Sequence, residues 1–208
     1  QIEEKLAQGF SCIKLKIGAI DFDKELGLLR FIRQNFDAKT IEIRVDANGA
    51  FNSNEALSKL NQLNEFELHS IEQPIKANQI QEMKLLCHQT PFPIALDEEL
   101  IGVFETEDKR KLLEEIQPQY IILKPSLVGG FKGTLEWISI AESLNIGWWI
   151  TSALESNIGL NAITQFTFTL NNPMPQGLGT GGLYTNNFDC PLQIENGHIQ
   201  YNVDKQWG

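Results

Sequence analysis

The sequence predicts an α/β fold and, more narrowly, a TIM-type (β/α) barrel. Short β-rich runs alternate with longer amphipathic stretches along most of the chain, which is typical of parallel strands joined by right-handed helical crossovers. Charged or polar residues end six successive runs at intervals of 25 to 30 residues. Units of such even length favour a barrel, in which every strand's carboxyl end opens onto one face. An open doubly wound sheet is the alternative, although no Gly-x-Gly-x-x-Gly follows the first run.

The individual elements follow from the local pattern. Strands rich in Ile, Leu, Val and Trp are predicted at 12–17, 41–46, 70–72, 94–97, 120–124, 148–151 and, more weakly, 177–179. Helices are predicted at 23–35, 54–63, 80–88 and 134–144, because their apolar residues recur at intervals of three and four. Asn54 and Thr134 stand where N-caps belong. The segment 166–170 alternates like a strand but equally fits a helix.

The two ends of the chain fall outside this repeat. The chain opens in a helical pattern with Ile2, Leu6 and Phe10, so the eighth strand of a closed barrel is expected upstream of Gln1. The tail reads as two short strands around Asn196-Gly197, a typical hairpin turn. We therefore predict a barrel domain over 1–190 that holds strands 2 to 8, and a hairpin tail over 191–208.

Composition excludes several classes of function. A formal net charge of −10 argues against a nucleic-acid partner, which would need a basic face. No apolar run is long enough to span a membrane. The three cysteines are far apart and contain no Cys-x-x-Cys pair, as in proteins of a reducing compartment. These features predict a cytoplasmic protein that binds neither nucleic acid nor membrane.

Two lysines on the first predicted strand project to one face. Lys14 and Lys16 are two residues apart among apolar neighbours. A lysine in a strand usually marks an exposed edge, which is the alternative interpretation. If the strand belongs to a barrel, these lysines point inward, where ammonium groups are costly unless anions lie close.

Three carboxylates provide those anions. Asp46, Glu72 and Asp97 end or nearly end successive strands, so a barrel brings them to one mouth. Together they would raise one another's pKa unless a cation lies among them, and hard oxygen ligands suit Mg²⁺, or alternatively Mn²⁺. Taken singly, each acid could instead be a helix N-cap. Lys124 ends the next strand and would stand roughly opposite Lys16, so the two lysines could reach opposite faces of a bound substrate.

The ordered motifs resemble those of the muconate-lactonizing subgroup of the enolase superfamily. They are Lys14-x-Lys16, Asp46-Ala47-Asn48, Ile71-Glu72-Gln73-Pro74, Leu96-Asp97-Glu98 and Leu123-Lys124-Pro125, and the resemblance extends from about Gly9 to Gly182. It implies a modified (β/α)7β barrel that here lacks its first strand and a separate N-terminal capping domain. The C-terminal hairpin is then expected to pack on that domain.

The resemblance also implies a role for each site residue. The three carboxylates would bind Mg²⁺, Lys16 would be the acid/base lysine, Lys14 would support the enolate electrostatically, and Lys124 would be the second lysine. Asn48 and Glu98 would orient the ligands and lysines. The substrate carboxylate would bind the metal, and the enediolate left by loss of the α-proton would be stabilised by Mg²⁺ and the lysines.

Within the subgroup, the last part of the predicted barrel resembles o-succinylbenzoate synthases. The likeness lies in 150–159, with Ser152 and Glu155, and in 177–187, with Gly179 and Thr180, and these four residues are the expected substrate contacts. A Gly-rich loop lets backbone N–H groups approach a ligand carboxylate, although a tight turn also explains the glycines. Dipeptide epimerases typically carry Asp-x-Asp near this strand, and Gly179-Thr180-Gly181 contains no acid.

We therefore expect a Mg²⁺-dependent lyase that dehydrates a cyclohexadiene carboxylate to o-succinylbenzoate in menaquinone biosynthesis. Its expected partners are a small carboxylate substrate and its own capping domain, and a homo-oligomer is left open. An N-acylamino acid racemase, a dipeptide epimerase or a cycloisomerase of the same subgroup is the first alternative. A non-catalytic ligand-binding barrel is the second, against which the intact lysines and carboxylates argue.

Overall fold

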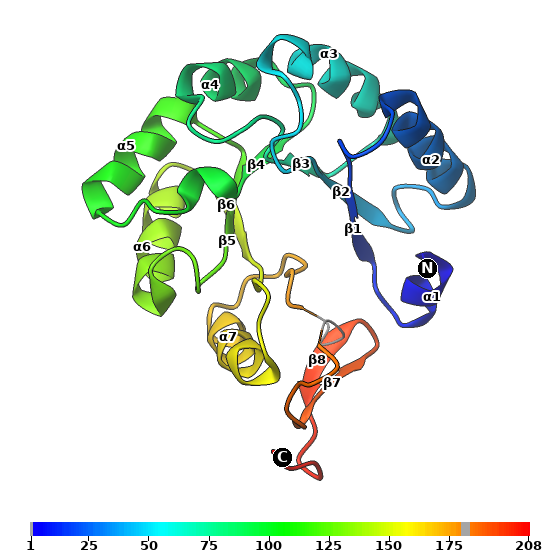
Figure 1. The fold of residues 1–208 in the computed structure, drawn as a ribbon, viewed down its shortest axis with the longest axis vertical. Helices are drawn as coiled ribbons and strands as arrows, with labels where there is room; N and C mark the ends of the chain where they lie inside the picture. Colours follow the sequence, from blue (N-terminus) through cyan, green and yellow to red (C-terminus); the bar gives the residue numbers. More distant parts are fainter. Residues whose placement is uncertain (1, 180–183) are drawn as a thin grey trace.

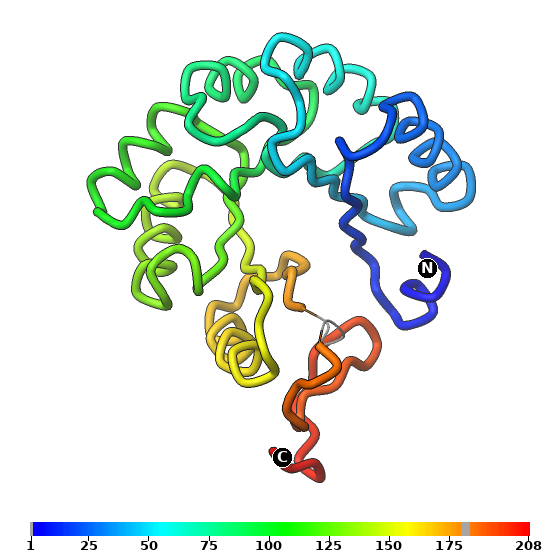
Figure 2. Tube along the Cα trace, viewed as in Figure 1, coloured from blue at the N-terminus to red at the C-terminus, as the bar shows by residue number. Residues whose placement is uncertain are grey.

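The computed structural model describes residues 2–179 and 184–208 and contains one curved parallel sheet (Figures 1 and 2). Six strands follow one another in chain order, each parallel to the next. They are β1 (Cys12–Lys16), β2 (Glu42–Asp46), β3 (Ser70–Glu72), β4 (Ile94–Leu96), β5 (Tyr120–Leu123) and β6 (Gly147–Ile150). All six carboxyl ends therefore lie along one edge, as the sequence predicted.

Helices cover the outside of the sheet. They are α1 (Ile2–Ala7), α2 (Phe22–Asn35), α3 (Ser53–Leu63), α4 (Ile80–Gln89), α5 (Thr106–Ile116), α6 (Gly130–Ser143) and α7 (Asn157–Thr169), with short 3-10 turns η1 (Asn64–Phe66) and η2 (Glu98–Leu100). Figure 1 shows α2 to α6 outside an arc of strands, which is the arrangement of a TIM-type barrel. The segment 166–169, which fitted both a strand and a helix, is helical.

Both predicted N-caps are wrong. Helix α3 begins at Ser53, one residue before Asn54, and its N-cap is Asn52. Helix α6 begins at Gly130, so Thr134 lies inside the helix, where its hydroxyl donates to the carbonyl of Gly130 at 2.8 Å. A threonine can bond back to the preceding turn in this way, which satisfies the hydroxyl without a cap.

The seventh predicted strand is reduced to a single bridge. Gly177 forms an isolated parallel bridge with Thr151, and residues 177–179, all of which the structure describes, form no longer strand. The Ser152 N–H donates to the Gly177 carbonyl at 3.1 Å, and the Gly177 N–H donates to the Ile150 carbonyl at 2.8 Å. A short glycine-rich segment offers few side chains to pack, which explains the weak pairing.

The predicted C-terminal hairpin is present. Strands β7 (Leu192–Glu195) and β8 (His198–Tyr201) pair antiparallel around Asn196 and Gly197, whose φ angles are 49° and 72°. Two positive φ angles are typical of a type I′ turn. The turn lies against the loop between α1 and β1, since a Cβ on Gly197 would be 2.4 Å from the Gly9 carbonyl oxygen. Packing of this hairpin on a capping domain stays a prediction.

The core lies between the sheet and the helices. Along β2, the apolar Ile43 and Val45 are almost fully buried, and they alternate with Glu42, Arg44 and Asp46. Because side chains of a strand alternate between faces, the charged residues share the inner face of the arc. Trp137 on α6 is fully buried, in keeping with a packing role. None of the described helices combines the length and apolarity that crossing a membrane would need.

Candidate active site

The sheet register brings the predicted carboxylates together. Lys16 is paired with Asp46 across β1 and β2, and Asp46 with Glu72 across β2 and β3. Asp97 follows β4 directly, and Lys124 follows β5 directly. Parallel strands in this register therefore place the five side chains along one edge of the sheet.

Lys14 and Lys16 share the carboxylate of Asp46. The Nζ atom of Lys14 is 2.9 Å from Asp46 Oδ2 and 2.9 Å from Glu72 Oε2. The Nζ atom of Lys16 is 2.6 Å from the same Asp46 oxygen. The side chain of Asp46 is fully buried, whereas that of Lys16 is 61% exposed. Lys14 thus bridges two carboxylates, and Lys16 contacts the network from its open side.

Lys124 contacts the other end of the carboxylate row. Its ammonium forms an ion pair with the buried Asp97. Strands β1 and β5 are separated by three strands in the sheet, and those three strands or the turns after them carry Asp46, Glu72 and Asp97. Lys16 and Lys124 therefore lie at opposite ends of one row of carboxylates.

The lysines of the site compensate the negative charge of Glu72 incompletely. Burial raises the pKa of Glu72 to about 8; Lys14 opposes this rise, and Asp46 and Asp97 add to it. Burial would also raise the pKa of Asp46, but Lys14 and Lys16 outweigh it and hold that pKa below its usual range. In addition, the buried Oε1 atom of Glu72 has no hydrogen-bond partner. An additional cation would compensate both features of Glu72.

The three carboxylates are chemically suited to a hard divalent cation, but their side chains are too far apart in this structure to coordinate one. The three carboxylates end or directly follow consecutive strands, and one of them, Glu72, carries the unpartnered buried oxygen. Within residues 2–179 and 184–208, however, no three acidic, histidine or cysteine side chains are gathered tightly enough to hold a metal as they stand. Lysine ammonium groups contact the carboxylates instead, so cation binding would require these side chains to turn toward a common centre.

Asn48 and Glu98 join this network. The Asn48 amide oxygen accepts a hydrogen bond from Lys16, and its amide nitrogen donates to Glu98 Oε1 at 2.8 Å. The backbone N–H of Asn48 donates to Asp46 Oδ1 at 3.0 Å. Asn48 therefore links the lysine, the carboxylate and Glu98, an arrangement that suits the predicted orienting role.

The predicted substrate contacts are only partly gathered. The backbone N–H of Gly179 donates to Ser152 Oγ at 2.6 Å, so these two residues lie together after β6. Glu155 accepts from the Ser126 hydroxyl at 2.6 Å, which ties it to the loop after Lys124. Thr180 lies outside the described residues.

Sequence reasoning missed two buried polar residues at the same edge. Gln73, directly after Glu72, is fully buried, and Glu99, two residues after Asp97, is 6% exposed. The available signal was a glutamine directly after the predicted ligand Glu72, and the motif alone does not predict that this glutamine is buried.

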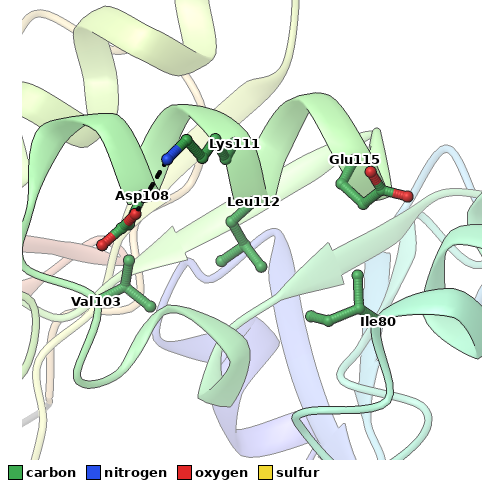
Figure 3. A pocket seen from close by; sticks show the side chains of 6 residues that line it. All are labelled: Ile80, Val103, Asp108, Lys111, Leu112 and Glu115. Carbon is green, nitrogen blue, oxygen red and sulfur yellow. Dashed lines mark ion pairs between the residues drawn. The ribbon is translucent and has the colours of Figure 1, made fainter.

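An open cleft elsewhere on the molecule has no connection with this chemistry (Figure 3). It lies between α4 and α5 and is lined by Ile80, Val103, Asp108, Lys111, Leu112 and Glu115. Lys111 and Asp108 form an ion pair at 3.7 Å across one turn of α5. None of the residues predicted for chemistry lines this cleft, which belongs to the outer helical layer.

Known proteins share both this sequence and this arrangement. An o-succinylbenzoate synthase of Desulfotalea psychrophila (strain LSv54 / DSM 12343) is 57% identical over 197 residues, or 95% of this chain and 53% of the relative. The crystal structure of MenC from Desulfotalea psychrophila LSv54 superposes with a TM-score of 0.91 at 55% identity, covering 95% of this chain and 55% of that one. The fold is thus that of a TIM-type enzyme domain, as predicted.

A more distant relative carries a different activity in its name. The L-Ala-D/L-Glu epimerase of Francisella tularensis subsp. novicida (strain U112) is 29% identical over 167 residues, or 79% of this chain and 46% of the relative. The chain spans about half the length of the curated relatives it matches. The family model described as "Enolase C-terminal domain-like" matches residues 1–205. With this match, the resemblance to the enolase superfamily is confirmed: the chain belongs to the enolase C-terminal domain-like family.

Proposed function

We propose that this chain is the catalytic barrel of an o-succinylbenzoate synthase, a lyase that dehydrates a cyclohexadiene carboxylate in menaquinone biosynthesis. The observation that carries the proposal is the placement of Lys16 and Lys124 at opposite ends of a row of three carboxylates. The similarity to the Desulfotalea psychrophila synthase supports this choice of reaction. The proposed enzyme acts in the cytoplasm, on a small carboxylate, together with its own capping domain.

Asp46, Glu72 and Asp97 would hold a divalent cation, Mg²⁺ or alternatively Mn²⁺. Such a cation, when bound, neutralises negative charge on the substrate carboxylate and thereby makes the adjacent α-proton more acidic. The unpartnered Oε1 of Glu72 and its raised pKa support this assignment.

In the proposed reaction, Lys16 is the general base. Its unprotonated amine takes the α-proton as the C–H bond breaks, and the electrons enter the carboxylate system as an enediolate. Lys16 then returns the proton to the departing hydroxyl as the C–O bond breaks, so that water leaves and the ring becomes aromatic. The 61% exposure of Lys16 and its contact with Asn48 are compatible with a side chain that meets the substrate at the open mouth.

Lys14 and Lys124 keep their protons in this proposal and stabilise the negative charge that develops on the substrate. Both are ion-paired with buried carboxylates, Lys14 with two of them and Lys124 with Asp97. Since aromatisation already favours elimination, positioning and charge stabilisation are the enzyme's main tasks.

The test is the ultraviolet absorbance of the full-length protein incubated with the cyclohexadiene precursor of o-succinylbenzoate. We expect loss of the diene absorbance with Mg²⁺ and no loss with excess chelator. A folded, metal-loaded protein that leaves the diene unchanged would overturn the proposal.

Epimerisation of dipeptides or N-acylamino acids is the second candidate. Two lysines at opposite ends of one carboxylate row also suit 1,1-proton transfer, and a relative that is 29% identical is named an epimerase. Both lysines would then exchange a proton with the substrate. Solvent deuterium at the α-carbon of recovered dipeptide, without dehydration of the diene, would favour this candidate.

A further inference from the structure

The side chain of Gln73, which directly follows Glu72 of β3, reaches the turn that carries Asp97. Its amide oxygen accepts from the backbone N–H groups of Asp97 at 3.2 Å and Glu99 at 3.3 Å. Its amide nitrogen donates to the carbonyl of Ile75 at 3.0 Å and to Glu99 Oε2 at 3.1 Å. All four hydrogen-bonding positions of this buried amide are therefore used.

The backbone of Gln73 contacts two further segments of the same edge. Its N–H donates to the Ala95 carbonyl on β4 at 2.9 Å, and its carbonyl accepts from the Gly49 N–H, after Asn48, at 2.7 Å. The φ angle of Gln73 is 39°, a left-handed conformation that is uncommon for a residue other than glycine. Such a conformation persists where the surroundings fix it, often beside a functional site.

Glu99 completes the connection. Its Oε2 accepts from the Gln73 amide, and its Oε1 accepts from the backbone N–H of Asn78 at 2.8 Å. No lysine or arginine of the described residues forms a salt bridge with this buried carboxylate, so its hydrogen bonds must compensate for its burial. A buried carboxylate held this way tolerates few other arrangements of the turn that carries Asp97.

We propose that Gln73 and Glu99 are positioning residues that fix the three carboxylates relative to one another and so set their affinity for a divalent cation. Gln73 contacts the turn after Asp46, adjoins Glu72 and binds the backbone of Asp97. Without this brace, formed by Gln73 and Glu99, the turn after β4 would be free to move away from Glu72. This inference rests on the proposed function, because it takes the three carboxylates to be the cation ligands.

The experiment is a Mn²⁺ titration of the full-length protein, with free Mn²⁺ followed by electron paramagnetic resonance and stability followed by thermal unfolding. Gln73→Met keeps the length of the side chain and removes its hydrogen bonds, and Glu99→Gln keeps the shape and removes the charge. The matched control is Gln119→Met. Gln119 accepts from the Ile94 N–H at 2.9 Å and donates to the Cys87 carbonyl at 3.1 Å, at the opposite end of the strands.

We expect Gln73→Met to weaken Mn²⁺ binding by about tenfold or more, as is typical when a residue that orients a ligand is lost. Glu99→Gln should weaken binding in the same direction, and it carries the test if Gln73→Met does not fold. Gln119→Met should lower the unfolding temperature while it binds Mn²⁺ like the wild type.

Two outcomes would overturn the brace while leaving the cation site in place. Either the Gln73 and Glu99 variants bind Mn²⁺ like the wild type, or Gln119→Met loses as much affinity as they do. In both cases a wild type that binds Mn²⁺ and consumes the diene would leave the proposed function intact. A wild type that takes up no Mn²⁺ would overturn the cation site and, with it, the brace.

Discussion

At the residue scale, the two lysines of β1 are in different environments although they are two positions apart. Lys14 is within 2.9 Å of both Asp46 and Glu72. Burial by itself would lower the pKa of Lys14, but the two carboxylates outweigh it and raise that pKa. A lysine that stays charged suits charge stabilisation rather than proton abstraction. Lys16, which contacts one carboxylate and is more exposed, is the better candidate for the base.

Replacing Lys16 tests that assignment. Lys16→Ala should lower turnover of the diene by about 10³-fold or more, because removal of a general base or nucleophile has effects of this order. Cation affinity should survive, since Asp46, Glu72 and Asp97 are unchanged. Steady-state absorbance assays and a Mn²⁺ titration measure the two quantities. Lys39→Ala, at an exposed position, is the control, and an active Lys16→Ala enzyme would contradict the assignment.

The raised pKa of Glu72 predicts a pH-dependent stability of the metal-free protein. The ordinary pKa of this carboxyl is 4.5, and its pKa in the folded protein is about 8. Between these two pH values the folded state therefore holds a proton on Glu72 that the unfolded state has lost. The contribution to stability is complete below pH 4.5 and is lost as the pH rises toward 8. Urea unfolding with chelator present should therefore show a midpoint that falls from about pH 5 to pH 8.

Glu72→Gln is the matched variant for that measurement, because it keeps the shape of the side chain and removes the titration. Its unfolding midpoint should fall less over the same pH interval than that of the wild type. Equal slopes for the two proteins would show that Glu72 is not the group responsible.

At the scale of single elements, buried charge also connects neighbouring helices. The side chain of Lys109 on α5 is 1% exposed, and its Nζ atom is 2.7 Å from Oε2 of Glu136 on α6. The same Nζ atom is 5.6 Å from the ring centroid of Trp137. Lys132, on the same helix as Glu136, is 2.8 Å from that carboxylate but 89% exposed. These two lysines lower the pKa of Glu136 to about 2. One carboxylate thus binds a buried and a solvent-exposed lysine.

The two lysines should differ in their effect on stability. Lys109→Ala removes a buried side chain from the contact between α5 and α6 and should cost about 2 kcal/mol or more of the free energy of unfolding. Lys132→Ala removes an exposed partner and should cost about 0.5 kcal/mol or less. Denaturant unfolding at pH 7 measures both, and equal losses would mean that burial of Lys109 adds nothing.

At the scale of the whole molecule, the site depends on distant parts of the chain. The carboxylates come from β2, β3 and the turn after β4, and the lysines come from β1 and the turn after β5. Figure 2 shows how the chain passes through the outer helices between one strand and the next. A cation held by the three carboxylates would therefore connect segments that are far apart in the sequence.

Cation binding should accordingly stabilise the whole fold. A ligand at about 100 times its dissociation constant adds roughly 2.7 kcal/mol to the free energy of unfolding when it binds only the folded state. We expect Mg²⁺ to raise the unfolding midpoint of the wild type and to have little effect on Asp97→Asn. Asp108→Asn, in the outer cleft, should respond like the wild type. A midpoint insensitive to Mg²⁺ would argue against the cation site.

The sequence by itself determined the order of strands, the positions of the charged residues that end them and the turn at Asn196-Gly197. These features depend on periodicity and local turn chemistry, which neighbouring residues decide. The sequence did not determine where α3 and α6 begin. Asn54 and Thr134 are residue types that often cap helices, but each helix begins before them, so both lie inside a helix. Tertiary structure alone decided that 177–179 pairs through one bridge and that Gln73 reaches the backbone of Asp97. Both depend on contacts between segments that are distant in the sequence, and no local pattern encodes them.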